Sequence, residues 1–225
     1  MVRLGCLSLI LFFVLILLFP LFLADIMSTA LMRLGLSPRT SLLLVVGIFV
    51  GGMMNIPVKK IPRDEVYEIN PSGLLGLDRL FHHSAALRPY TLIAVNVGGC
   101  VIPVLIAAYE LLRLAGLPGG VLMTGLVGIA LNTAVCYYLA RPVSGIGIAM
   151  PAFVPGLVAA AYALLFAPEA APAVAFTAGV LGPLIGADLL HLREIGRVST
   201  GFASIGGAGT FDGIVISGLL AALLA

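Results

Sequence analysis

Long apolar runs separated by short polar stretches dominate this chain of 225 residues. Runs of about 18 residues or more are long enough to cross a bilayer as helices. We expect seven spans, at about 4–32, 40–57, 91–113, 119–140, 146–167, 171–192 and 208–225. The pattern therefore predicts an all-α, polytopic transmembrane helix bundle that forms a single integral membrane domain over residues 1–225.

The first apolar run, MVRLGCLSLILFFVLILLFPLFLA, has the position of a secretory signal peptide. The apolar core of a signal peptide is about 7–15 residues long, whereas this run continues for about 20 residues. We therefore interpret it as the first transmembrane helix.

The longest polar stretch, residues 58–90, holds nine of the 22 formally charged residues. Val66, Tyr67 and Ile69 favour strand, so we expect a small strand or hairpin in this loop. A short amphipathic helix near 73–83 should follow it. The loop could act as a lid or a substrate-binding strand, or it could simply cover the membrane interface.

Composition supports a membrane protein and excludes other classes. Apolar residues make up 61% of the chain and charged residues 10%, whereas soluble domains carry about 25% charged residues. The mean hydropathy is +1.18. No basic stripe or aromatic platform indicates nucleic-acid binding. Cys6, Cys100 and Cys136 lie in apolar segments without CxxC spacing, so we expect small core residues and neither disulfides nor a metal site.

Lysine and arginine predict the orientation. One face would carry nine of these residues, and the other face would carry three: Arg33, Arg39 and Arg113. The nine are Arg3, Lys59, Lys60, Arg63, Arg79, Arg88, Arg141, Arg193 and Arg197. By the positive-inside rule, we expect a multi-pass protein of the inner (cytoplasmic) membrane, with a cytoplasmic N-terminus and the C-terminus outside.

Two carboxylates lie inside apolar segments, where an ionisable group indicates function. Asp188 is near the end of the sixth span, in GADLLHL, and Asp212 is near the start of the seventh, in GGAGTFDG. The chain turns between them, so both should lie at similar depth on neighbouring helices. Glu110, by contrast, lies three residues before Arg113 and should pair with it or face headgroups.

Facing carboxylates share one proton, since both cannot ionise cheaply at short range. This is the condition for water activation by an aspartyl protease, so we predict that Asp188 and Asp212 are catalytic. Glycines before Asp212 would let a substrate backbone approach closely. The candidate substrate-binding residues are Gly207, Gly209, Thr210, Gly213, Asn55 and Asn96. Topology places Asn55, Asn96, Ser144, Ser204 and Thr210 in one layer near the cytoplasmic edge.

Each aspartate also has a purely structural interpretation. Asp212 could cap a helix N-terminus, and Asp188 could pair with Arg193 or Arg197. His191 lies one helical turn after Asp188, so these two and Asp212 could form a three-ligand metal site. An interfacial histidine is the simpler explanation, and we expect no metal.

The glycine run GFASIGGAG could cradle a phosphate at a helix N-terminus. It lacks the Lys-Ser/Thr pair of a phosphate-binding P-loop. We therefore expect a shielded loop and no cofactor.

The segments GADLLHL and GGAGTFDG resemble an uncharacterised prokaryotic integral-membrane family, one of the domain-of-unknown-function families. NIP at 55–57 and NVGGCVIP at 96–103 extend the resemblance over most of the chain. Membership of that family implies no known activity.

An aspartate on one helix and Gly-x-Gly-x-x-Asp on the next is similar to the presenilin and signal-peptide-peptidase class of intramembrane aspartyl proteases. That resemblance implies catalytic roles for Asp188 and Asp212 near the cytoplasmic side. The sequence departs from that class in three places. Thr210 and Phe211 stand between the glycines and Asp212, Ala187 replaces a tyrosine, and no Pro-Ala-Leu follows.

Three functions follow from these features. The first is an intramembrane aspartyl protease, a hydrolase with a cytoplasmic-side active site and a transmembrane peptide as substrate. The second is a transporter or channel-like protein that binds a proton or cation at the same carboxylates. The third is a non-enzymatic membrane assembly factor. The lipid bilayer is the expected environment for all three.

Overall fold

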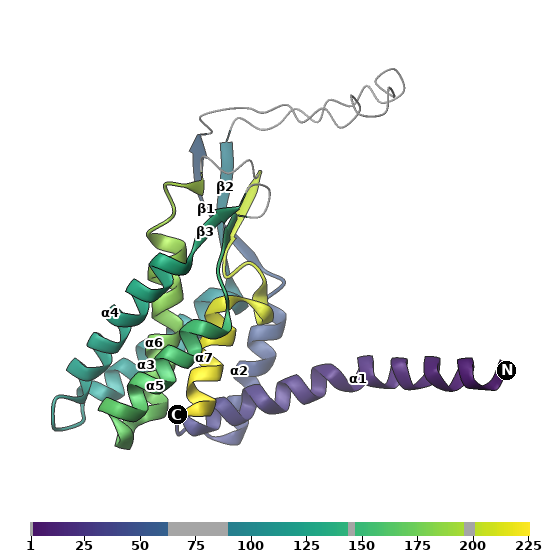
Figure 1. The fold of residues 1–225 in the computed structure, drawn as a ribbon, viewed down its shortest axis with the longest axis horizontal. Helices are drawn as coiled ribbons and strands as arrows, with labels where there is room; N and C mark the ends of the chain where they lie inside the picture. The colour runs from purple at the N-terminus through teal and green to yellow at the C-terminus, as the bar shows by residue number, and fades with distance from the viewer. Residues whose placement is uncertain (1, 63–89, 144–146, 196–200) are drawn as a thin grey trace.

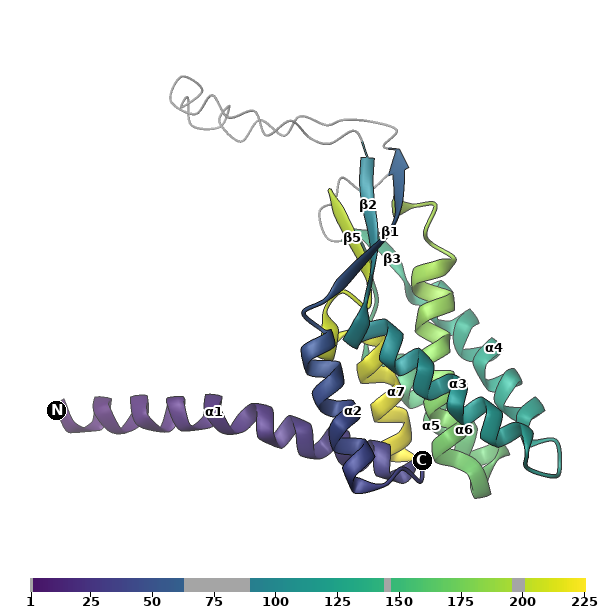
Figure 2. The same cartoon turned by 180° about the vertical axis from the view of Figure 1, so that it is seen from behind.

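The computed structural model describes residues 2–62, 90–143, 147–195 and 201–225 (Figures 1 and 2). The described part of the chain is mostly helical. Its α-helices are α1 (Val2–Arg33), α2 (Pro38–Gly51), α3 (Ile102–Ala115), α4 (Val121–Leu139), α5 (Phe153–Phe166), α6 (Ala171–Pro183) and α7 (Gly213–Leu224). Two π-helical turns extend this set, Val97–Val101 before α3 and Leu184–Leu189 after α6.

The helices confirm the membrane character that the apolar runs predict. Four described helical segments are long and apolar enough to cross a bilayer, namely Leu11–Arg33, Val97–Ala115, Val121–Leu139 and Pro168–Leu189. The other three apolar helices, α2, α5 and α7, are 10–17 residues long. The seven expected spans therefore correspond to seven helical segments, of which four have full spanning length.

Helix α6 is the centre of the helical part, where it packs against α4, α5 and α7. Small residues allow this close packing. A Cβ on Gly179 of α6 would lie 2.8 Å from the Ser217 carbonyl oxygen of α7, which is closer than a side chain can approach. Interfaces of this kind are typical of helices that associate within a membrane.

The N-terminal half of α1 differs from the other helices, because Figure 1 shows it projecting from the rest of the chain. Its large apolar side chains, such as Phe12, Phe13 and Leu17, are exposed. An apolar helix surface of this kind is compatible with lipid.

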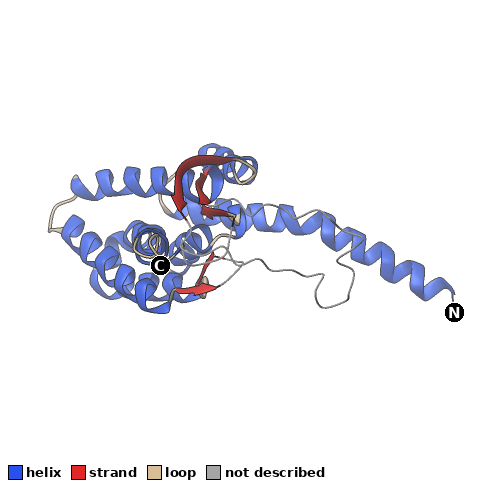
Figure 3. Cartoon of the chain, turned by 90° about the horizontal axis from the view of Figure 1, so that it is seen from above, coloured by secondary structure: helices blue, strands red, loops and turns tan. Residues whose placement is uncertain are grey.

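Two small sheets lie at one end of the helices, as Figures 1 and 3 show. The three-stranded sheet has the order β1 (Asn55–Pro62), β2 (Tyr90–Asn96), β5 (Phe202–Ile205), with β1 antiparallel and β5 parallel to β2. The second sheet pairs β3 (Arg141–Val143) with β4 (Gly147–Ala149). The fold is therefore helical with two sheets, which corrects the all-α prediction.

The sheets explain where the expected span boundaries are wrong. Residues 55–57 and 91–96 were expected at the ends of spans, but they form paired strands. Thr91, Ile93 and Val95 are β-branched and alternate, which favours strand, and the apolar residues between them hide this alternation. Strand β4 likewise occupies the expected start of the fifth span, and α7 begins only at Gly213.

Strand β1 extends into the expected 58–90 loop as far as Pro62, but Val66, Tyr67 and Ile69, on which the expected β element depends, lie outside the described residues. The amphipathic helix expected near 73–83 lies outside the described residues.

Candidate functional site

The structure brings Asp188 and Asp212 to one small pocket of about 100 Å³. Asp188 comes from the π-helical turn Leu184–Leu189, and Asp212 immediately precedes α7. Among the described residues that line this pocket, none is a lysine, arginine or histidine. The other lining residues are Ile93, Gly147, Ile148, Ile195, Ala203, Ser204 and Ile205. We refer to this space as the aspartate pocket.

Asp212 is the N-cap residue of α7, as its structural interpretation predicts. Its Oδ1 accepts a hydrogen bond from the Ile214 N–H at 3.0 Å, and its Oδ2 accepts one from the Ala208 N–H at 3.3 Å. Burial raises the pKa of Asp212 above its usual value, and these two backbone donors act in the opposite direction. A capping role and a chemical role are compatible, since hydrogen bonds of this kind stabilise the ionised form.

Asp188 has a different environment. Among the described residues, none donates a hydrogen bond to its carboxylate or forms an ion pair with it. The alternative in which Asp188 pairs with Arg193 is therefore not found, and Arg197 lies outside the described residues. The π-helical turn that carries Asp188 follows Pro183, and turns of this type occur frequently at functional sites.

His191 does not join the two aspartates. Its ring is buried, its Nδ1 is 3.0 Å from the Gly186 carbonyl oxygen, and its centroid is 4.8 Å from that of Tyr137. Across the part of the chain that the structure describes, no group of three or more His, Cys, Asp and Glu side chains forms a potential metal site. The metal alternative with His191, Asp188 and Asp212 thus has no geometric support.

The expected polar layer is present, but it supports the sheet. Asn55 Oδ1 accepts hydrogen bonds from Ser204 Oγ at 2.6 Å and from Asn96 Nδ2 at 3.1 Å. Asn96 also donates to the Gly52 carbonyl at 2.8 Å and accepts from the Gly99 N–H at 2.7 Å. Three segments distant in sequence therefore meet here, as predicted, while Ser144 lies outside the described residues.

The glycines before Asp212 allow the chain to pack against itself. Gly206 and Gly209 have positive φ angles of 71° and 60°. A Cβ on Gly99 would lie 2.0 Å from the Gly206 carbonyl oxygen, and one on Gly209 would lie 3.1 Å from the Gly52 Cα. These positions need glycine because two backbone segments touch there, a contact that the sequence does not reveal.

None of the six expected substrate-binding residues lines the aspartate pocket. The expected set was Gly207, Gly209, Thr210, Gly213, Asn55 and Asn96. The pocket is lined instead by residues of β2, β4 and β5 that were not expected there. The sequence signal for these strands is the alternation of apolar residues over a few positions. This alternation was not recognised because the same residues were assigned to helical spans.

A larger pocket of about 590 Å³ adjoins the aspartate pocket, because Ile93 and Ile205 line both. It lies between β1, β2, β5 and the segment that follows Asp188. Its other lining residues are Val58, Lys59, Lys60, Ile61, Pro62, Val95, Leu189, Leu192 and Arg193.

Strand register divides the three-stranded sheet into two faces. Lys59 pairs with Ile93, which pairs with Ala203, and paired residues point to the same side of a sheet. These residues, with Ile61, Val95 and Ile205 at alternate positions, form what we call the pocket face. Lys60 and Ser204 belong to the opposite face.

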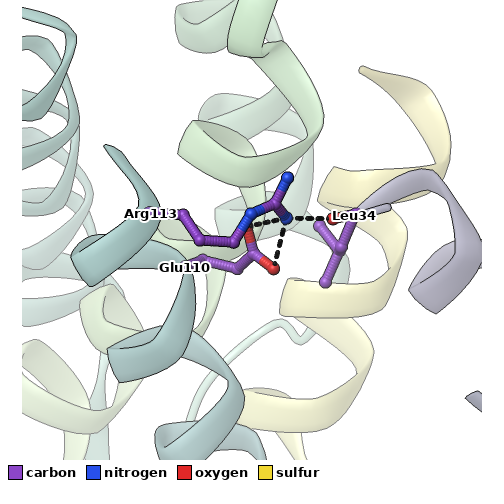
Figure 4. Close-up of polar contacts among 3 residues, drawn as sticks. All are labelled: Leu34, Glu110 and Arg113. Carbon is purple, nitrogen blue, oxygen red and sulfur yellow. Dashed lines mark hydrogen bonds and ion pairs between the residues drawn. The ribbon is translucent and has the colours of Figure 1, made fainter. Parts of the chain in front are cut away.

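A third carboxylate, Glu110, lies near the C-terminal end of α3, which is distant from the sheets in Figure 1, and Figure 4 shows its contacts. Its side chain is 0% exposed and forms an ion pair with Arg113 at 2.9 Å. Arg113 also donates to the Leu34 carbonyl oxygen, which joins α3 to the turn between α1 and α2. The pairing expected for Glu110 is confirmed.

Residues 49–224 match the model of one family, described as Protein of unknown function (DUF1614). The chain belongs to this family, which confirms the resemblance to an uncharacterised family. No curated protein and no solved structure matches the chain. The similarity to presenilin-type proteases therefore depends only on the residues in the two aspartate segments.

Proposed function

We propose that the chain is a membrane-embedded aspartyl hydrolase that uses Asp188 and Asp212 to cleave a peptide bond. The observation that supports this proposal is the shared aspartate pocket, which two carboxylates from different elements line with no cationic side chain among its described residues. Its volume of about 100 Å³ is large enough to hold the water that such a reaction consumes.

The two hydrogen-bonding environments suggest separate roles. Asp212 accepts two backbone N–H bonds, which favour its ionised form, whereas Asp188 has no described donor. Asp212 would therefore take a proton from water as the water oxygen attacks the peptide carbonyl carbon. Asp188 would donate its proton to the carbonyl oxygen. Breakdown of the tetrahedral diol returns a proton to the departing nitrogen and gives a carboxylic acid and an amine.

The sheets suggest how a substrate would bind. β5 is at the end of the strand order in the described sheet, and Ala203, Ser204 and Ile205 of β5 line the aspartate pocket. Gly147 and Ile148 of β4 line it as well. An extended peptide could add to β5 through main-chain hydrogen bonds, which is a common mode of peptide recognition. Its scissile carbonyl would then lie beside the two aspartates.

The orientation proposed for the chain places this site on the cytoplasmic side of the inner membrane. Lys59, Lys60, Arg141 and Arg193 belong to the end with the sheets, and Arg113 belongs to the other end. This distribution supports a cytoplasmic N-terminus and a C-terminus outside by the positive-inside rule.

The decisive experiment tests cleavage by the purified full chain in lipid vesicles. Single-span membrane peptides of varied sequence would be incorporated with it, and products would be identified by mass spectrometry. We expect cleavage by the wild type. Asp188→Asn and Asp212→Asn should each lower the rate by about 10²–10⁴-fold, the usual contribution of general acid–base catalysis.

Asp25→Asn is the matched control, since Asp25 is an exposed carboxylate of α1 that lines neither pocket. It should leave the cleavage rate unchanged. Cleavage that survives both pocket substitutions would contradict the proposed role of the aspartates, as would a wild type that cleaves none of the peptides.

A proton or cation transporter is the second candidate function. It is favoured because Asp188 lies in a segment of spanning length and no described group donates a hydrogen bond to its carboxylate. In this case a pH gradient would drive ion movement in vesicles that contain the chain. Asp188→Asn would abolish that flux, and no peptide would be cleaved.

A further inference from the structure

The larger pocket has a chemistry that the proposed hydrolysis does not use. Its floor is apolar, formed by Ile61, Ile93 and Val95 of the pocket face, with Leu189 and Leu192 on the other wall. A volume of about 590 Å³ is within the usual range of about 300–1,000 Å³ for small-molecule sites. The aspartates line only the smaller, neighbouring pocket.

Two cations meet at this pocket from separate elements. Lys59 is on the pocket face of β1, and Arg193 follows Leu192 on the opposite wall. Both side chains are exposed, and among the described residues neither forms an ion pair. None of the described residues that line the pocket is an aspartate or glutamate. The site therefore offers positive charge above an apolar floor.

Lys60 provides an internal comparison, although it too borders the pocket. It is adjacent to Lys59 in sequence, but the strand alternation places it on the opposite face of the sheet. Its Nζ lies 5.0 Å from the centroid of the Tyr90 ring, which gives it a partner of its own. Lys59 and Lys60 carry the same charge but belong to opposite faces of the sheet. Their side chains therefore have different surroundings, although both residues border the pocket.

We propose that the larger pocket binds an anionic phospholipid, with the headgroup phosphate between Lys59 and Arg193 and acyl-chain carbons on the apolar floor. The ligand needs a negative charge to match Lys59 and Arg193. It also needs a long apolar part to match the apolar floor of the pocket. The neighbouring segment Pro168–Leu189 has spanning length, so the pocket adjoins a part of the chain suited to the bilayer. Basic pockets beside membrane helices are suited to lipid headgroups.

This inference does not depend on the proposed hydrolysis, because binding is measured without a peptide. The full chain, purified in neutral detergent, would be titrated with phosphatidylglycerol and with phosphatidylcholine, and bound lipid would be counted by native mass spectrometry. We expect phosphatidylglycerol to bind at least about fivefold more tightly than phosphatidylcholine. Affinity should also rise from four-carbon to longer acyl chains, since the floor is apolar.

Variants then locate the site. Lys59→Gln and Arg193→Gln should each weaken phosphatidylglycerol binding about fivefold, and the double variant should remove the preference over phosphatidylcholine. Arg141→Gln, which also removes one positive charge from an exposed side chain at the sheet end but at a residue that lines neither pocket, should change the affinity by less than twofold. The exposed positions make loss of folding unexpected, and thermal melting of each variant checks this point.

Three results would overturn the proposal. One is equal binding of the two lipids by the wild type. A second is an equal effect of Arg141→Gln and Lys59→Gln, which would indicate only general surface charge. The third is affinity that does not change with acyl-chain length together with full competition by inorganic phosphate, which would indicate a soluble phosphate ligand.

Discussion

The two ends of the molecule hold carboxylates in opposite ways. At the end distant from the sheets, Glu110 is fully buried and is neutralised by Arg113, whose side chain is 45% exposed and also binds the Leu34 carbonyl (Figure 4). At the end with the sheets, Asp188 and Asp212 line one pocket in which no cation is found within the described part of the chain. The first arrangement joins helices, whereas the second leaves two carboxylates available to a ligand or a substrate.

This difference shows why an ionisable residue in a membrane segment needs its partners identified before a function is assigned. A buried charge with a complementary partner has a sufficient structural explanation. Asp212 has a structural explanation as the N-cap of α7, whereas Asp188 has no described partner, and two carboxylates in one pocket favour the sharing of a proton. Substitutions at the two ends should therefore affect different properties.

The largest effect should come from the backbone contact that supports the sheet end. Gly99→Ala would place a Cβ about 2.0 Å from the Gly206 carbonyl oxygen. We expect a loss larger than the ~1–3 kcal/mol of ordinary overpacking and little folded protein, measured by size-exclusion chromatography in detergent. Gly125→Ala is the control, because its Cβ would be 3.4 Å from a Leu114 side-chain atom. Normal yield of the Gly99 variant would show that the two segments can separate.

The ion pair at the other end should have the next largest effect. Arg113→Met leaves the Glu110 carboxylate buried without its partner, so we expect a loss of about 3 kcal/mol in the free energy of unfolding. Peptide cleavage or lipid binding per folded molecule should not change. Glu110→Gln should cost less, because Arg113 is half-exposed and keeps its bond to the Leu34 carbonyl. If the folded Arg113→Met protein loses peptide cleavage or lipid binding, the Glu110–Arg113 pair is not purely structural, and the proposed difference between the two ends is wrong.

The pH dependence of cleavage would test the role of Asp212. If its ionised form is the base, the rate should fall about tenfold for each pH unit below its pKa. Burial raises that pKa, so the midpoint of the acidic limb should lie above the ordinary aspartate value of about 3.9. A pH–rate profile of the purified chain measures this midpoint. A midpoint at or below about 3.9 would argue against a buried base.

The smallest effect should separate capping from chemistry at Asp212. Asp212→Ala removes the acceptor for the Ile214 N–H and should cost about 1 kcal/mol, whereas Asp212→Asn should cost only a few tenths. Both variants should lose cleavage. Thermal melting and the cleavage assay together distinguish the two roles. If Asp212→Asn keeps full cleavage, Asp212 is only a cap.

Much of the helical part could be predicted from sequence. The apolar runs locate seven helical segments because a helix satisfies its own backbone hydrogen bonds and shows only apolar side chains to lipid. The spacing of Glu110 and Arg113 also predicts their pairing, since residues three apart are neighbours on a helix.

The sheets could not be predicted in the same way. Strand β2 is as apolar as a helix end, and its pairing partners β1 and β5 are distant in sequence. The composition of a segment does not indicate which distant segments will form hydrogen bonds with it in a sheet. The expected substrate-binding residues do not line the aspartate pocket, although Asn55, Asn96 and Ser204 do meet.

The sequence by itself determined a membrane protein, its helical segments and the presence of two aspartates in consecutive apolar segments. Only the tertiary structure decided that these aspartates share a pocket, that Arg193 lies at a different pocket with Lys59, and that the glycines serve backbone contact. The reason is physical. Helix formation depends on neighbouring residues, whereas a pocket exists only where segments far apart in the chain meet.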